Sequence, residues 1–211
     1  MDYKILGLTS KNITVVFETL DLRKISIDQL KQVGGPAIPS PRVLEIDDNT
    51  LVAIFDATQT IAEIADRRLR VTDRSPTTTE GTSLPDLVIA LVNLFPFEMI
   101  AYGFNFDVIV ELEGTEDSNL FFRDRFLVKR LHSNLLAGLQ TIGLETKLRL
   151  MSSVGTQYEL KIVPGTGPDN RPTALCSLNA HYEEPELPNQ DNLRQLLVDN
   201  YQTLLDMLQN L

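Results

Sequence analysis

The chain has 211 residues, 43% of them hydrophobic, and its 19 basic and 29 acidic residues give a formal net charge of −10 at pH 7. This hydrophobic content supports a folded core and excludes a disordered chain. The negative charge opposes a phosphate backbone, so we expect no nucleic-acid partner. The only basic cluster comprises Arg67, Arg68, Arg70 and Arg74.

Targeting signals and metal motifs are missing from the sequence. The first residues lack the basic flank and apolar run of a signal peptide, and no window of about 18 apolar residues occurs. The single Cys176 cannot form an internal disulfide, and His132 and His181 are too few for a multi-histidine metal site. We therefore expect a cytoplasmic protein with no membrane association, no metal and no cofactor.

The first half of the chain predicts strands and two helices. The expected elements are a strand over 13–18, a helix over 26–33, strands over 42–47, 51–57 and 61–73, and a helix over 83–95. Ser26 and Gln29 have the spacing of a capping box, and Ser83 is expected to cap the second helix. Residues 61–73 mix helical and alternating patterns, and we interpret them as one bulged strand.

The clearest pattern in the chain covers residues 99–112. Apolar side chains occupy the even positions, whereas Asn105, Asp107 and Glu111 occupy odd ones. Successive side chains of a strand point to opposite faces, so this alternation predicts a long strand with one face on a core and one exposed.

The second half continues with one helix, three alternating strands and a terminal helix. The expected elements are a helix over 119–138, strands over 144–150, 157–162 and 174–182, and an amphipathic helix that begins near Asn189. The sequence thus predicts an α+β fold: a long, mostly antiparallel sheet with helices on one face, forming a single compact domain over 1–211.

The order of elements repeats. Residues 12–95 and 98–211 each predict strand, helix, three strands and helix, a pseudo-duplicated β-α-β-β-β-α unit. This layout resembles that of TATA-binding-protein-like folds, and the second half resembles the sheet and terminal helix of the SecB export chaperone. The segments 102–106 and 178–182 are also similar to a scattered family of uncharacterised bacterial proteins. The chaperone resemblance implies protein binding and agrees with the acidic charge.

The exposed sheet face holds the candidate binding residues. The alternation places ten polar side chains there, namely Asn105, Asp107, Glu111, Glu145, Lys147, Arg149, Glu159, Lys161, Asn179 and His181. Cross-strand ion pairing accounts for such a face, and the alternatives are a polar binding surface centred on Asp107, Arg149 and His181 or an acid–base pair of His181 with Asp107. Arg68 and Arg70 are candidates for anion recognition.

No catalytic triad, paired-carboxylate motif or metal-ligand spacing occurs, and Gly165-Thr166-Gly167 lacks the Lys of a phosphate-binding loop. The sequence therefore favours a non-enzymatic protein-binding or assembly module, chaperone-like, that uses the sheet face or an edge. The alternative is a small-molecule-binding protein or enzyme with a pocket between the sheet and its loops. Edge strands must be paired or covered, so we also expect a homodimer, with 13–18 as the candidate edge.

Overall fold

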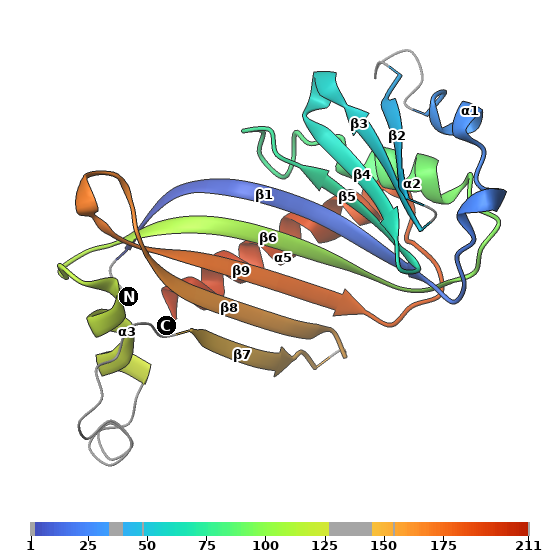
Figure 1. Ribbon diagram of the computed structural model, residues 1–211. Coiled ribbons are helices and arrows are strands. Elements are labelled where there is room, and N and C mark those ends of the chain that lie inside the picture. Colours follow the sequence, from blue (N-terminus) through green and yellow to red (C-terminus); the bar gives the residue numbers. More distant parts are fainter. Residues whose placement is uncertain (1–2, 34–39, 48, 127–144, 154, 211) are drawn as a thin grey trace.

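The structure is a computed structural model that describes residues 3–33, 40–47, 49–126, 145–153 and 155–210 (Figure 1). The strands are β1 (Tyr3–Phe17), β2 (Arg42–Asp47), β3 (Thr50–Phe55), β4 (Thr60–Ala65), β5 (Arg68–Asp73), β6 (Met99–Leu112), β7 (Thr146–Met151), β8 (Gln157–Thr166) and β9 (Pro172–Tyr182). The helices are α1 (Ile27–Leu30), α2 (Leu84–Val92), α3 (Ser118–Phe126) and α5 (Gln190–Gln209), with 3-10 turns at Leu22–Lys24, Asp56–Thr58 and Pro168–Asn170.

All nine strands form one sheet in the order β2-β3-β4-β5-β1-β6-β9-β8-β7. Every neighbouring pair is antiparallel. The predicted α+β fold with a long antiparallel sheet is therefore confirmed, and the predicted strand over 99–112 coincides with β6.

The core lies between the sheet and the helices α2 and α5. Figure 1 shows α5 running behind the long strands β6 and β9. The ring of Phe106 on β6 lies 5.6 Å from that of Tyr201 on α5, and Phe17 on β1 lies 5.7 Å from Phe95, just after α2. The two helices thus cover the same face, and we call the opposite side the open face.

Local sequence explains where the helices begin. The side chain of Ser26 accepts a hydrogen bond from the Gln29 amide at the start of α1, and Asn189 accepts one from Asn192 at the start of α5. Both caps agree with the sequence. Ser83 precedes α2 but its side chain makes no capping bond, and Thr82 accepts the Leu84 amide instead.

Residues 61–73 form two strands, so the prediction of one bulged strand was wrong. The strands β4 and β5 are joined by Asp66 and Arg67, which have φ angles of 49° and 63°. Two consecutive positive φ angles are typical of the tight hairpin turn that matches strand twist. The first half consequently has four strands after α1, where the repeated layout required three.

The strand predicted over 13–18 is the end of a much longer strand. β1 begins at Tyr3 and lies between β5 and β6, so its selection as an edge strand was wrong. The edges of the sheet are β2 and β7. The helix predicted over 119–138 is confirmed as far as Phe126, and its remainder, with the predicted strand start at 144, falls outside the described residues.

Candidate functional site

Three asparagines stand side by side at the centre of the open face. Asn12 of β1 pairs in register with Asn105 of β6, which pairs with Asn179 of β9. Asn179 Nδ2 donates a hydrogen bond to Asn105 Oδ1, and Asn105 Nδ2 donates one to Asn12 Oδ1 at 2.7 Å. We call this row the asparagine ladder, and it runs perpendicular to the strands.

The next row of the open face holds a carboxylate between two hydroxyls. Asp107 of β6 pairs in register with Ser10 of β1 and Ser177 of β9. Ser10 Oγ donates to Asp107 Oδ2 at 3.0 Å, and Ser177 Oγ donates to Asp107 Oδ1 at 2.6 Å. Both carboxylate oxygens therefore accept a hydrogen bond from the protein.

Around these rows the open face is hollowed into a shallow groove of about 550 Å³. Its lining residues are Ser10, Asn12, Arg70, Thr72, Arg74, Asn105, Asp107, Glu159, Lys161, Ser177, Leu178 and Asn179. These residues come from β5, β1, β6, β9 and β8 or adjoin them, in the order of the sheet. We call this feature the ladder groove.

Arginines on β5 and directly after it lie at one end of the ladder groove. Arg70 and Arg74 line it, and Arg68 is exposed two residues before Arg70 on the same strand. Glu63 of β4 lies opposite Arg70 in register. Within the described part of the chain, none of these three arginines has a carboxylate within 4.0 Å.

At the other end the charges are paired across strands. Glu159 of β8 binds Lys147 at 2.7 Å and Arg149 at 3.1 Å. The hydrogen bond from Lys147, reinforced by Arg149, lowers the pKa of Glu159. Lys161 binds Glu145 at 3.1 Å. Cross-strand ion pairing, which the sequence predicted for the exposed face, is present at this end.

The structure separates Asp107 from His181 and Arg149, although the sequence placed all three at the centre of the face. His181 pairs with Gly103, four residues from Asp107 along β6, and at about 3.4 Å per residue this corresponds to about 14 Å. Arg149 lies near His181 at the β7 edge, in a second shallow hollow that also contains Gln157 and Asn179. The acid–base pair of His181 with Asp107 is therefore not formed.

A buried ion pair was missed by the sequence analysis. Lys11 of β1 points into the core side and its ammonium lies 3.1 Å from Asp73, with exposed fractions of 1% and 2% for the two side chains. Lys11 also donates to the carbonyls of Ser75 and Thr77, and Asp73 accepts hydrogen bonds from the Ser75 amide and Thr82. The ion pair thus ties the loop after β5 to β1, because Lys11 and Asp73 both hydrogen-bond to residues of that loop.

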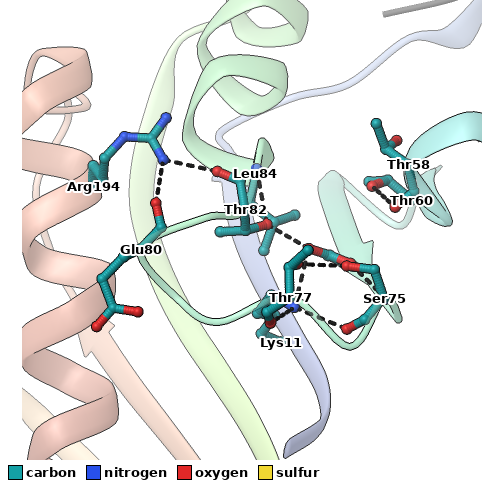
Figure 2. Close-up of polar contacts among 10 residues, drawn as sticks. Lys11, Thr58, Thr60, Ser75, Thr77, Glu80, Thr82, Leu84 and Arg194 are labelled. Carbon is teal, nitrogen blue, oxygen red and sulfur yellow. Dashed lines mark hydrogen bonds and ion pairs between the residues drawn. The ribbon is translucent and has the colours of Figure 1, made fainter.

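Figure 2 shows this loop with α5 at the left. Arg194 of α5 donates to the carbonyls of Glu80 and Thr82, while Lys11 lies among Ser75 and Thr77 on the other side of the loop. Two cations thus hold the loop against the sheet and the terminal helix. Arg194 also binds Asp86 of α2 at 2.7 Å. Arg194 therefore links α5 both to this loop and to α2.

A second groove, of about 750 Å³, lies beside the C-terminal end of α2. Its apolar walls come from α2, from the start of β6 and from the segment before α5, and they include Ile89, Val92, Phe97, Met99 and Leu187. The charged residues in its lining are Glu98 and Glu186. This groove suits a ligand with an apolar body.

The one cysteine of the chain, Cys176, is buried on β9. Burial raises the pKa of the Cys176 thiol to about 12, so this side chain is a poor nucleophile. The described residues include no group of three His, Cys, Asp or Glu side chains placed to hold a metal ion. Among the same residues, no helix is long and apolar enough to cross a lipid bilayer.

No protein-family model matches this chain, and a search of curated proteins finds no similar sequence. The site must therefore be interpreted from its own chemistry.

Proposed function

We propose that the protein is a non-enzymatic binding or assembly module that holds a protein partner on the open face of its sheet. The observation that carries this proposal is the ladder groove, which gathers amide, hydroxyl and guanidinium groups from β5, β1, β6 and β9 beside the charged side chains of β8. Such groups recognise the polar backbone and side chains of a polypeptide by hydrogen bonds.

Several further features support this function. The groove spans the centre of the nine-stranded sheet, and the register of the strands makes its lining residues neighbours. The resemblance of the second half to the SecB export chaperone also favours protein binding, in the cytoplasm of a bacterium. The sheet edges β2 and β7 offer a second copy of the chain a route to a homodimer.

The proposal predicts that the open face is needed to retain a partner. The tagged protein would be used to capture partners from extracts of its native host, in parallel with a variant carrying Asn105→Lys and Asn179→Lys. The control is Gln209→Lys, an exposed position at the end of α5. We expect a partner that the wild type and the control retain and the double variant loses. A partner retained equally by all three proteins would contradict the proposal.

The alternative is a small-molecule-binding protein, and the apolar groove beside α2 is the observation that favours it. A ligand that binds only the folded state raises the melting temperature in proportion to the logarithm of its concentration. Thermal-shift measurements against metabolites, with Val92→Glu as the variant that fills this groove with a charge, separate the two functions. A saturable shift that Val92→Glu abolishes would favour the alternative.

A further inference from the structure

We infer that the ladder groove binds an extended acidic segment of a protein partner, with the acidic side chains of that segment held at the β5 end by Arg70 and Arg74. This inference rests on the proposed function and names the chemistry of the partner.

The asparagine ladder has a direction. Each primary amide has two N–H donors and an oxygen with two lone pairs. The ladder runs from Asn179 through Asn105 to Asn12, and Asn12 Oδ1 accepts from both Asn105 and Thr14. Both lone pairs of the Asn12 side-chain oxygen therefore accept hydrogen bonds, whereas the described residues provide no acceptor for Asn12 Nδ2. The end of the ladder at β1 thus presents donors, and the end at β9 presents the acceptor Asn179 Oδ1.

The cations lie at the donor end. β5 is the neighbour of β1, and the groove is lined by Arg70 of β5 and by Arg74, which directly follows it. Neither guanidinium has an ion-pair partner among the described residues, whereas Lys161 at the far end is paired with Glu145. Asn12 Nδ2 and the two guanidinium groups thus gather as donors at this end of the groove, beside the Thr72 hydroxyl. Carboxylates are the protein groups that best match donors of this kind, since guanidinium binds them with two parallel hydrogen bonds.

Arg70 and Arg74 select where an acidic partner binds, because they form a local positive site on a chain whose net charge is −10. An acidic partner is repelled by most of the surface and attracted at this end of the groove, so charge orients it. Glu159, although paired, places a carboxylate at the β8 end. The acidic part of the segment therefore belongs over β5, and its neutral polar part lies over the ladder.

The dimensions fit an extended segment. The groove crosses five strands, and four spacings of about 4.8 Å give about 19 Å. At about 3.3 Å per residue, this length accommodates about six extended residues. Arg70 lies on β5, and Arg74 directly follows the end of that strand. Each guanidinium can bind one carboxylate with two parallel hydrogen bonds, so we expect the segment to carry at least two acidic side chains.

The inference is tested with a fluorescein-labelled peptide, Gly-Ser-Asp-Asp-Glu-Glu-Ser-Gly with an amidated C-terminus, by fluorescence anisotropy. The comparison peptide carries Asn and Gln in place of Asp and Glu. We expect the acidic peptide to bind more tightly than its neutral counterpart, and its affinity to fall as salt rises from 50 to 500 mM, since exposed ion pairs are screened. Combined Arg70→Gln and Arg74→Gln substitution should weaken binding by about tenfold.

Arg149→Gln is the matched control, because Arg149 lies on the same face but is paired with Glu159. This variant should bind the acidic peptide like the wild type. Equal binding of the two peptides, or an unchanged affinity in the Arg70 and Arg74 double variant, would overturn the inference. Binding of a phosphopeptide or an oligonucleotide without binding of the acidic peptide would also overturn it, and would assign the cations to phosphate.

Failure of this inference is distinguishable from failure of the proposed function. If capture of a native partner depends on Asn105 and Asn179 while the acidic peptide does not bind, only the partner's chemistry is wrong. If capture is independent of the open face, the proposed function itself is wrong. Urea unfolding of each variant checks that it remains folded.

Discussion

Among individual residues, Lys11 and Asp73 are charged side chains that lie buried as an ion pair. Burial of an ion pair stabilises a fold only when both charges are well hydrogen-bonded, and removal of one partner leaves an uncompensated charge. Burial by itself would raise the pKa of Asp73, but hydrogen bonds from Ser75, Thr82 and Lys11 outweigh that effect and lower it. The carboxylate is therefore charged in the folded protein at neutral pH.

We predict that Asp73→Asn lowers the free energy of unfolding at pH 7 by about 3 kcal/mol, because the Lys11 ammonium remains buried without its counter-ion. The folded-state pKa of Asp73 lies below its unfolded value of about 3.9. Its contribution is thus complete above about pH 5 and is lost as the pH falls through the folded-state pKa. Urea unfolding at pH 7, 5, 4 and 3 should show the wild type and the variant converging in acid.

Asp56→Asn provides the control for this measurement. Asp56 binds Arg42 at 2.7 Å, but both side chains are 64% exposed. Exposed pairs contribute little to stability, so this variant should unfold close to the wild type at pH 7. A loss from Asp73→Asn no larger than that from Asp56→Asn would show that the buried pair does not stabilise the loop.

The sequence contained part of the information about these residues. Lys11 lies two, four and six positions before Ile13, Val15 and Phe17 on the same strand, so alternation alone places its side chain on the core side with theirs. The partner is sixty-two positions away, at Asp73, and a periodic pattern gives no distance between such residues. The candidate residues Asn105 and Asn179 were placed on the exposed face by alternation, but Asn12 joined them only once β1 was known to pair with β6.

At the scale of elements, strands with strong alternation were predicted well and those with local exceptions were not. β6 keeps a two-residue period of burial from Phe104 to Leu112, whereas in β1 the polar run Ser10-Lys11-Asn12 precedes the strand predicted over 13–18. In the structure this run continues the strand, because a distant carboxylate neutralises Lys11 and distant polar groups bind Ser10 and Asn12. The hairpin at Asp66 and Arg67 lacks the glycine that usually marks such turns.

The pairing of β6 with β9 depends on a glycine. A Cβ atom at Gly103 would lie 2.7 Å from the carbonyl oxygen of Ala180. We predict that Gly103→Ala lowers the free energy of unfolding by about 2 kcal/mol, since the two strands must separate to admit the methyl group. Thermal and urea unfolding measure this change.

Gly7→Ala is the matched control in β1. A Cβ atom at Gly7 meets no other atom within 4 Å. Because alanine restricts the unfolded chain more than glycine, this substitution should be neutral or stabilising by up to about 1 kcal/mol. Equal effects of the two substitutions would show that the contact with Ala180 is not the cause.

At the scale of the whole molecule, the two outer strands are the candidate sites of self-association. Leu44 on β2 and Leu150 and Met151 on β7 are exposed by 45%, 45% and 70%. We predict a homodimer, formed through one of these edges, whose mass by size-exclusion chromatography with light scattering is twice 23.7 kDa. If β2 forms the dimer, Leu44→Lys should yield the monomer. If β7 forms it, the combined Leu150→Lys and Met151→Lys variant should do so. A mass near 23.7 kDa for the wild type at high micromolar concentration would exclude it.

Strand order could not be derived from the sequence, because alternation assigns faces and not neighbours. β1 and β6 meet at the centre of the sheet, and their pairing joins Tyr3 to Leu112, residues more than a hundred positions apart. The strands β2 to β5, in contrast, are connected by short hairpins.

This central pairing has a consequence for synthesis on the ribosome. When β1 leaves the exit tunnel, β6 has not yet been translated, so one side of β1 carries unpaired backbone groups while the β2–β5 hairpins are forming. At about 5 to 20 residues per second, the delay before β6 emerges lasts at least several seconds. During this interval the nascent chain exposes a strand edge in the crowded cell, and closure of the long loop between β1 and β6 sets the earliest time at which that edge is protected.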